Sequence, residues 1–499
     1  MTEIATKSDN SRFFSILQER IQTKAVWLKN IHAIMSIKHL KISILTIIIS
    51  TLGALSTFAQ SNTDSIMLRK IYSECMLNSN AYLHLEELCK EVGGRLAGSP
   101  QAAQAVEMFE KWGKTIPGVT VTKQPCMVPH WVRGRAEQAV IYREGTSPIL
   151  MHPCALGNSV ATPQKGIRAK VVEILRWSQL DSLGKAGLLK DKIVFYDRPM
   201  NPTFVDPGEA YGDAVDQRWG GASRAAKYGA VASVIRSVTH AYDAFPHTGA
   251  MGYEDTVKRI PAFALSTIDA ALLAACVHGN PNLELYLWDE CQMMGDVLSY
   301  NVIVEMKGSE HPEEIITVGG HLDSWDLAEG AHDDGTGVVQ ALEVIRIFSK
   351  LGIKPKRTIR AVAFMNEENG NRGGKAYAAV AKEKGEKHIA AIESDGGGFT
   401  PTGFSCSNGN RYQTALKHRW FGLLAAYGLR DFDRNGGGTD ISPLGRELNV
   451  NLFGLEVDPQ RYFDYHHTAN DVFENVNPRE MNMGAAAMAM LVYLISEDK

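Results

Sequence analysis

The sequence predicts an α/β fold in which a largely parallel β-sheet is covered by helices on both faces. From Leu298 onward, short apolar and β-branched runs alternate with segments that have helical spacing. The clearest unit joins residues 315–318, which are typical of a buried strand, to residues 338–349, whose apolar side chains recur as in a helix. This alternation is typical of parallel sheets. Between about residues 133 and 290 this alternation of strands and helices gives way to short β-like runs. The change favours a mostly β region that folds as an inserted domain.

The parallel-sheet region can be divided into elements in chain order. Strands are expected at 301–306, 315–318, 358–365, 389–393 and 450–457, and helices at 338–350, 373–384, 411–427 and 478–496. The amino-terminal part adds helices at 64–92 and 101–114 and a strand at 119–132. The helix at 101–114 follows the turn-rich loop 93–100 and ends before Pro117-Gly118, since proline and glycine stop helices.

The intervening region has a different pattern. Turns rich in Gly, Pro and Asp separate expected strands at 139–142, 169–174, 192–196, 230–235 and 283–288, and one helix is expected at 222–228. Its sequence contains no cluster of residues of metal-ligand type. We therefore expect the chemistry of the protein to come from the parallel-sheet region.

Composition restricts the class of protein. The chain has 499 residues, 44% hydrophobic and 22% charged, which is ordinary for a globular protein of two or more domains. A net charge of −4 excludes the basic surface that is typical of nucleic-acid-binding proteins. The seven cysteines form no CxxC pair, which argues against a cysteine-ligated zinc site. Their odd number leaves at least one free thiol and is compatible with one or two disulfides.

Residues 1–59 are predicted to be a leader. A positive patch at Lys38 and Lys41 precedes a mostly apolar run at 42–55, and small residues end the segment at Thr57 and Ala59. These are the three parts of a signal peptide at about 35–59, so we expect an exported protein, periplasmic or extracellular. An uncleaved membrane anchor is the alternative, although the run is short for a span. If Met35 is the true start, residues 1–34 are not translated. No second apolar span follows.

Histidine and acidic residues occur next to the expected strand ends. In open α/β sheets, sites form at the carboxyl ends of the strands. Zinc binds histidine nitrogen and carboxylate oxygen, and catalytic zinc keeps one position for water. The candidates with this chemistry are His321, Asp333, Glu368, Asp395 and His467. If Asp333 bridges two zinc ions, each ion has one histidine, one further carboxylate, the bridge and the water.

Two further residues have candidate catalytic roles. Glu367 adjoins Glu368 where a strand turns into a loop, so one can bind metal while the other takes a proton from water as general base. Neighbouring negative charges would raise its pKa toward neutrality. Asp323 is two residues after His321, on the same face of an extended strand, so its side chain is expected to orient the imidazole.

Each of these patterns also has a purely structural interpretation. The pair at 333–334 could cap the helix that follows, and adjacent glutamates are usually solvated. Residues 394–398 could form a turn, and residues 466–471 could begin a helix. Their occurrence in order, each beside an expected strand end, favours the metal site.

At these residues the chain resembles metallopeptidase family twenty-eight, which contains zinc aminopeptidases and glutamate carboxypeptidases. The resemblance rests on His321-Leu322-Asp323, residues 333–337, the glutamate pair, Asp395, and His467-Thr468 with Asp471. Residues 319–326 and the double histidine at 466–467 are similar to the glutamate carboxypeptidase branch. The family resemblance implies that His321 and Asp395 hold one zinc and that Glu368 and His467 hold the other. Asp333 would then be the bridge and Glu367 the base.

The resemblance also implies the domain organisation and the substrate pocket. The zinc-peptidase core, of doubly wound type, would comprise residues 60–130 and 296–499, and a protease-associated insertion would comprise 131–295. Residues 436–440, with Thr439 and Asp440, resemble the loop beside the family's pocket. His466 or Tyr465 could stabilise the oxyanion. The branch resemblance further suggests a homodimer.

The function predicted from these observations is a secreted di-zinc exopeptidase that hydrolyses dipeptides or short peptides. A carboxypeptidase or dipeptidase and an aminopeptidase of the same family are both compatible with the sequence. The candidate residues for a carboxylate clamp are Arg411, Arg434, Arg446 and Arg461. The competing interpretations are a single-zinc glutaminyl cyclase on the same scaffold, which the complete ligand set argues against, and a non-catalytic peptide-binding relative.

Overall fold

The structure is a computed structural model that describes residues 15, 18–27, 29, 35 and 63–498. The chain divides into two units, Met1–Met67 and Leu68–Lys499, and in the first unit residues 18–27 are helical. The predicted signal peptide, with its apolar run and cleavage site, lies outside the described residues except for Met35. Within the described part, no helix combines the length and the apolar character needed to cross a bilayer.

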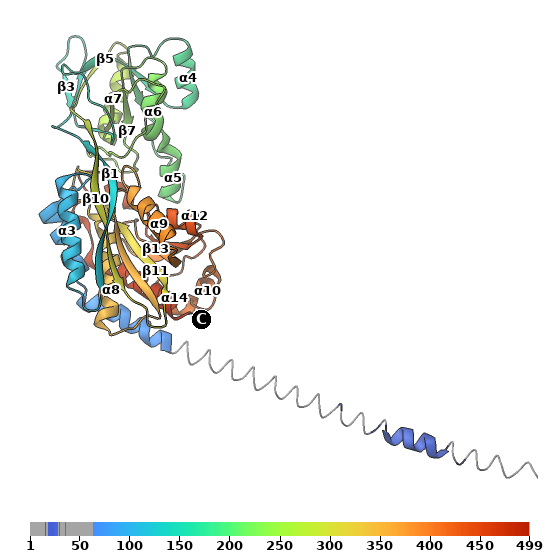
Figure 1. The fold of residues 1–499 in the computed structure, drawn as a ribbon. Helices are drawn as coiled ribbons and strands as arrows, with labels where there is room; N and C mark the ends of the chain where they lie inside the picture. The colour runs from blue at the N-terminus through green and yellow to red at the C-terminus, as the bar shows by residue number, and fades with distance from the viewer. Residues whose placement is uncertain (1–14, 16–17, 28, 30–34, 36–62, 499) are drawn as a thin grey trace, which may run out of the picture. The chain divides into compact units, whose positions relative to one another are not determined.

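A seven-stranded mixed sheet forms the centre of the second unit (Figure 1). Its strands lie in the order β1 (Thr120–Val132), β10 (Gln292–Met306), β12 (Arg357–Phe364), β11 (His311–His321), β13 (Lys387–Glu393), β15 (Asn451–Val457) and β14 (Pro401–Cys406). The four strands from β12 to β15 are parallel, whereas β1, β10 and β14 are antiparallel to their neighbours. The parallel centre places the carboxyl ends of four strands at one edge.

The helices cover both faces of this sheet. Strand β11 leads through α8 (Thr336–Lys350) to β12 on one side of it, and β12 leads back through α9 (Arg372–Lys384) to β13 on the other side. Crossovers between parallel strands are right-handed, so this reversal of direction puts α8 and α9 on opposite faces. Helix α14 (Pro478–Glu497) packs beside α8, and α12 (Ser442–Leu448) packs beside α9. The prediction of an α/β fold with both faces covered is therefore confirmed.

The sequence misjudged some elements of this part. The single helix expected at 411–427 is two short helices, α10 (Gln413–Lys417) and α11 (Phe421–Ala425). The backbone leaves the helical region at His418, and buried Trp420 turns inward to stack on Tyr412 at 6.0 Å between ring centroids. Tertiary packing overrides local propensity here. Strand β14 and helix α12 were not expected.

The amino-terminal part of the second unit covers the same sheet. Within this unit the helix expected at 64–92 is divided into a first helix that ends at residue 78, α2 (Ala81–Glu87) and the π-helical turn Leu88–Val92. Helix α3 (Pro100–Lys114) begins at the N-cap Ser99, whose side chain accepts a hydrogen bond from the backbone N–H of Ala102. It packs against β1 and β10.

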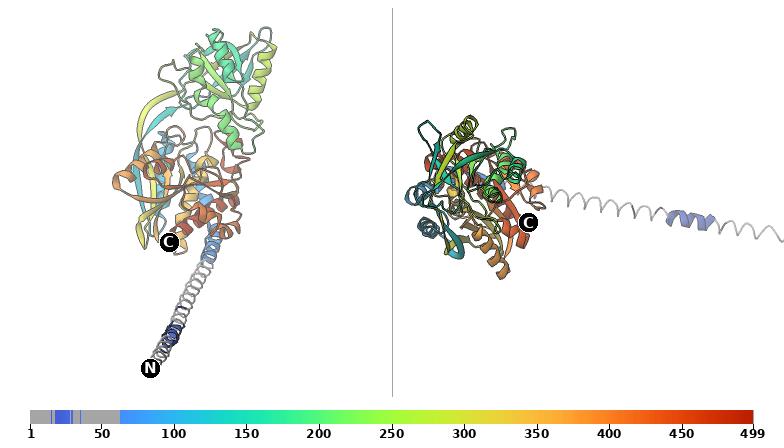
Figure 2. Two further views of the ribbon diagram at one scale, coloured as in Figure 1. Left: turned by 90° about the vertical axis from the view of Figure 1, so that its right-hand side faces the viewer. Right: turned by 90° about the horizontal axis from the view of Figure 1, so that it is seen from above.

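Residues between β1 and β10 form a second, eight-stranded sheet (Figures 1 and 2). Its order is β3 (Ile149–Met151), β2 (Gln138–Tyr142), β9 (Glu284–Trp288), β5 (Ile167–Ile174), β6 (Ile193–Tyr196), β7 (Ala232–Arg236), β8 (Ala262–Leu265) and β4 (Pro153–Ala155). All five expected strands are present. The predicted domain boundaries, 131 and 295, fall inside β1 and β10, the two strands that connect the sheets.

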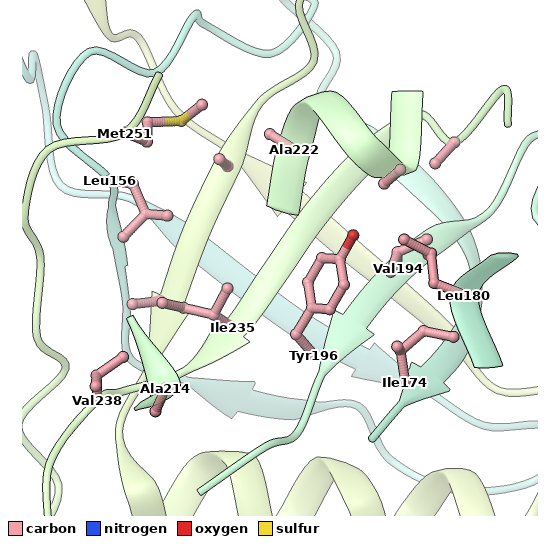
Figure 3. Packing of buried hydrophobic residues seen from close by; sticks show 14 of the residues in the cluster. Leu156, Ile174, Leu180, Val194, Tyr196, Ala214, Ala222, Ile235, Val238 and Met251 are labelled. Atoms are coloured by element: carbon pink, nitrogen blue, oxygen red, sulfur yellow. The ribbon is translucent and has the colours of Figure 1, made fainter. Parts of the chain in front are cut away.

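This region contains more helix than the sequence predicted. One helix was expected, and the structure has α4 (Trp177–Lys185), α5 (Pro207–Ala214), α6 (Asp216–Ala226) and α7 (Thr267–Gly279). Helix α7 is apolar on nearly all sides, so it has no stripe that marks a helix in the sequence. One hydrophobic core, around Tyr196 and Leu180, joins α4–α6 to one part of the sheet (Figure 3). A second core includes residues of α7.

All seven cysteines lie in the described part of the chain, and all are free and buried. Burial raises the pKa of the Cys126 thiol to about 11, so it stays protonated at neutral pH. The disulfides that the sequence allowed are not present in this structure.

Candidate metal centre

Five candidate ligands converge at the carboxyl edge of the seven-stranded sheet. His321 is the last residue of β11, and Asp333 lies in the turn Ala331–Gly335 that precedes α8. Glu368 follows β12, and Asp395 follows β13. His467 comes from the loop after the short helix α13 (Tyr462–Tyr465). Neighbouring parallel strands end at the same edge, so residues far apart in sequence meet there.

The carboxylate of Asp333 lies between two histidine–carboxylate pairs. Its Oδ1 is 3.2 Å from Nε2 of His321, which in turn is 3.3 Å from Oδ1 of Asp395. Its Oδ2 is 3.3 Å from Nε2 of His467, which is 3.1 Å from Oε2 of Glu368. Each oxygen of Asp333 therefore faces one histidine and, beyond it, one further carboxylate.

These spacings match those of atoms that share a tetrahedral zinc ion. Two ligand atoms that each lie about 2.0–2.1 Å from the metal are about 3.3 Å apart. Oδ2 of Asp333 and Oδ1 of Asp395 are buried and have no hydrogen-bond partner in the described residues, as expected of oxygen atoms that can coordinate a cation. One residue group that could hold a metal is His321, Asp333 and Glu368, and another is Asp333, His466 and His467. The residues present therefore fit a metal centre.

The orientation of His321 is set by the backbone, not by the side chain that the sequence suggested. Its Nδ1 donates to the backbone carbonyl of Asp323 at 2.9 Å, which directs Nε2 toward Asp333. The carboxylate of Asp323 points elsewhere: its Oδ1 accepts from the backbone N–H groups of Asn366 at 2.6 Å and Glu367 at 3.1 Å. Asp323 therefore holds the glutamate loop in place. Strand periodicity alone could not distinguish these two roles.

The backbone around Asp333 is fixed by two other carboxylates. Asp471 accepts from the N–H groups of His332 at 2.7 Å and Asp333 at 3.0 Å. Asp334 accepts from His321 N–H at 3.0 Å and from Gly337 N–H at 2.9 Å, so it caps α8 and ties the helix to the end of β11. The Asp333–Asp334 peptide bond is cis. Of the adjacent acidic residues, one faces the centre and the other has the capping role.

The two adjacent glutamates also divide their roles. Oε1 of Glu368 accepts from the N–H of Trp325 at 3.2 Å while Oε2 faces His467. Glu367 lines the cavity beside the centre. Burial, followed by the negative charges of Asp395 and Asp333, raises the pKa of Glu367 to about 7, although His321 opposes the shift. A carboxylate of this basicity can accept a proton near neutral pH.

His467 is held by the region between β1 and β10. Its Nδ1 lies 3.3 Å from the carbonyl oxygen of Thr248, and the Thr248 N–H donates to the His467 carbonyl at 3.0 Å. Nδ1 of His247 lies 2.8 Å from the carbonyl oxygen of His466. His467 has a φ of +64°, which a non-glycine residue adopts only when its surroundings hold it there. A loop of the region between β1 and β10 therefore supports a candidate ligand that follows α13.

A cavity of about 540 Å³ opens beside these ligands and is lined by residues both of the seven-stranded part and of the region between β1 and β10. The seven-stranded part contributes His321, Asp333, Glu367, Glu368, Asp395, Thr439, Tyr462, His466 and His467. The inserted region contributes Asn158, Tyr211, Arg218, Trp219 and Ala250. The sequence analysis did not find this second group, because its members have no ligand pattern and reach the site only when the two sheets pack together.

The expected substrate residues are distributed unevenly around the cavity. Thr439 and His466 line it, but Asp440 is fully buried and its two carboxylate oxygens have no partner in the described residues. Tyr465 does not line it: its ring stacks on His332 at 5.1 Å. Tyr462, one turn earlier in α13, lines the cavity instead.

The four arginines expected to clamp a carboxylate do not line this cavity. Arg434 pairs with Asp206 at 2.6 Å at the edge of a neighbouring cavity, and Arg461 pairs with Glu480 at 3.1 Å. Arg411 lies over Tyr412, 4.5 Å from its ring centroid, and Arg446 is exposed. The arginine that does line the cavity is Arg218, from α6.

Comparison with known proteins agrees with this geometry. The model of peptidase family M28 matches residues 301–492, a range that contains all five candidate ligands. Carboxypeptidase Q of Bos taurus is 31% identical over 433 residues, which cover 87% of this chain and 88% of that protein. Carboxypeptidase Q of Homo sapiens is 32% identical over 419 residues, or 84% and 86% of the two chains.

The chain belongs to peptidase family M28. A solved structure of a peptidase M28 precursor from Shewanella amazonensis SB2B superposes with a TM-score of 0.82 at 34% identity, and covers 88% of this chain and 98% of that one. An aminopeptidase from Aneurinibacillus sp. strain AM-1 shares the fold at a TM-score of 0.59 and 22% identity. At the level of the family, the prediction of a zinc-dependent exopeptidase is confirmed.

Proposed function

We propose that this M28 peptidase is a di-zinc exopeptidase that hydrolyses dipeptides or short peptides. One observation carries the proposal: the two oxygens of Asp333 face separate histidine–carboxylate pairs. A single-zinc site needs only one of these pairs. The relatives named carboxypeptidase Q, which align over most of both chains, support a carboxypeptidase or dipeptidase over an aminopeptidase.

In this proposal each zinc has its own pair of ligands and shares Asp333. His321 and Asp395 hold one ion, Glu368 and His467 hold the other, and their spacings support this division. When bound, the zinc ions polarise the peptide carbonyl and lower the pKa of water.

Glu367 has the role of general base. Its carboxylate accepts a proton from the attacking water and delivers that proton to the nitrogen of the leaving amine. Its place in the cavity and its raised pKa support this role, and the hydrogen bonds that Asp323 accepts keep its loop in position. His466 and Tyr462, which line the same cavity, are the proposed donors to the oxyanion.

The size of the cavity favours small substrates. About 540 Å³ bounded on two sides accommodates a few residues of peptide, and the inserted region restricts access for a long chain. We also propose that the protein is exported after cleavage near Ala59, because the leader has the three parts of a signal peptide. Amino-terminal sequencing of protein secreted by a suitable host would give a start near residue 60 if this is correct.

The first experiment is a zinc determination on the purified protein, together with hydrolysis of a dipeptide panel with and without chelator. Two zinc ions per chain and cleavage that chelator abolishes are the expected results. One zinc per chain would favour a glutaminyl cyclase. Two zinc ions without hydrolysis of any peptide would contradict the proposed activity and favour a binding protein.

A further inference from the structure

Arg218 is a buried cation without a counter-ion. It lies in α6, its exposed fraction is 9%, and within the described residues it has no carboxylate oxygen within 4.0 Å. Its Nε is buried without a hydrogen-bond partner. Arg133, which is equally buried, shows the usual arrangement, since it pairs with Asp326 at 2.7 Å and Glu137 at 2.9 Å. A buried charge with no partner is costly, so Arg218 calls for an anion from outside the chain.

The protein groups nearest to Arg218 do not satisfy it. Its Nη1 lies 3.5 Å from Nδ1 of His467. If Nε2 of His467 is a metal ligand, Nδ1 carries the ring proton and donates to the carbonyl of Thr248. Nδ1 then cannot accept a hydrogen bond from the guanidinium. The other close group is Tyr211, whose hydroxyl hydrogen-bonds the guanidinium and whose ring centroid lies 5.4 Å from the guanidinium carbon, but neither contact supplies a negative charge.

The guanidinium is held in place at the wall of the cavity. Gly249 packs against it so closely that a Cβ at this position would lie 2.5 Å from Cζ of Arg218 and 2.7 Å from Nδ1 of His467. The φ of Gly249 is +130°, a conformation that disfavours other residues. Arg218 lines the same cavity as Asp333 and Glu367. Its unsatisfied donors are therefore beside the candidate metal centre and open to the substrate.

We propose that Arg218 binds the α-carboxylate of the peptide substrate, so that the site selects a free carboxyl end next to the scissile bond. A guanidinium presents parallel N–H groups that match a carboxylate. The carboxylate of a dipeptide lies one residue, about 3.8 Å along the chain, from its peptide carbonyl. Arg218 is separated from the metal-facing Nε2 of His467 by a single imidazole ring, which suits this length. The inference rests on the proposed peptidase function.

The test compares Ala-Ala with Ala-Ala-amide, which differ only in the terminal carboxylate. Wild-type enzyme should favour the free acid in kcat/KM by at least about 30-fold, the low end of the effect of leaving a buried charge unpaired. In Arg218→Met this preference should fall to near one, chiefly through KM, and Arg218→Lys should retain an intermediate preference. The matched control is Arg446→Met, at an exposed arginine, which should keep the wild-type ratio.

A binding assay on zinc-loaded variants completes the design. Calorimetry on Glu367→Gln and on Glu367→Gln/Arg218→Met, both loaded with zinc, measures binding of Ala-Ala and Ala-Ala-amide without turnover. The expected result is tighter binding of the acid only where Arg218 is present. An unchanged acid-to-amide ratio in Arg218→Met, or a wild type that favours the amide, would overturn the inference while leaving the peptidase function intact. Loss of hydrolysis in wild type with selective acid binding would instead refute the peptidase function alone.

Discussion

The carbonyl oxygen of Thr248, in the region between β1 and β10, lies 3.3 Å from Nδ1 of His467, in the loop after α13. These residues are 219 positions apart in the sequence. The contact fixes which nitrogen of His467 carries the proton and therefore which nitrogen faces Asp333. The region between β1 and β10 thus positions a residue of the candidate metal centre as well as shaping the cavity.

A substitution at His247 should weaken this support. His247→Phe removes the hydrogen bond from its Nδ1 to the His466 carbonyl, so the loop that carries His467 should loosen. Zinc affinity should fall by about 10–100-fold at one of the two sites, the usual effect of losing a group that orients a ligand. Competition with a chromophoric chelator measures this change. His278→Phe, at an exposed histidine of the same region, is the control and should bind zinc as wild type does.

Replacement of the proposed base should separate metal binding from catalysis. Glu367→Gln keeps the size of the side chain but removes its ability to accept a proton, so kcat should fall by about 10²–10⁴-fold. Zinc content should remain at the wild-type value, because Glu367 is not among the residues that face the histidines. Turnover within a few-fold of wild type would refute the role of Glu367.

Activity should decrease on the acid side of neutrality. Glu367 must be a carboxylate to accept a proton, and burial together with Asp395 and Asp333 raises its pKa from 4.5 to about 7. Bound zinc adds positive charge and moves this pKa downward. The acid limb of kcat/KM should therefore lie between pH 4.5 and about 7, with activity falling as pH falls. A profile flat down to pH 4 would contradict this assignment.

Arg95 should be important for stability although it is outside the cavity. It is fully buried and donates to the backbone carbonyls of Leu322 at 2.6 Å and Gly330 at 2.9 Å, at the two ends of the loop after β11. Arg95→Met would remove the hydrogen bonds to Leu322, Glu329 and Gly330, of which, among the described residues, only the Gly330 carbonyl keeps a backbone partner, the Gly335 N–H at 3.0 Å. The substitution should lower the free energy of unfolding by about 3 kcal/mol. Chemical denaturation measures the change. Arg135→Met, at an exposed arginine, should leave the midpoint unchanged.

The candidate ligands could be predicted from the sequence because their positions follow from local rules. Each of His321, Glu368 and Asp395 lies at or just after a strand of the parallel centre, and parallel strands end at one edge. The assignment of ligands to two pairs came from the family resemblance, and the distances around Asp333 agree with it. The expectation that these residues meet at one edge did not require knowledge of the order of the strands in the sheet.

Other parts of the site could not be predicted because they depend on side-chain direction or on packing between distant segments. Asp323 has the spacing of a residue that orients His321, yet its carboxylate contacts the glutamate loop. Tyr465 and Tyr462 differ by three positions in a short helix, and only the coordinates show that Tyr462 lines the cavity. Arg218 resembles any other arginine of an amphipathic helix until α6 is placed beside the metal centre.

From the amino-acid sequence alone one can predict the fold class, the edge of the sheet where the candidate centre lies, and the chemical nature of the candidate ligands. These properties follow from hydrophobic periodicity and from the ordinary affinity of zinc for imidazole and carboxylate. The tertiary structure decided which ring nitrogen of His467 faces Asp333, and it placed the buried charge of Arg218 at the cavity wall. Both depend on contacts between chain segments more than 200 residues apart, and local sequence rules cannot specify contacts that form only when the two sheets pack together.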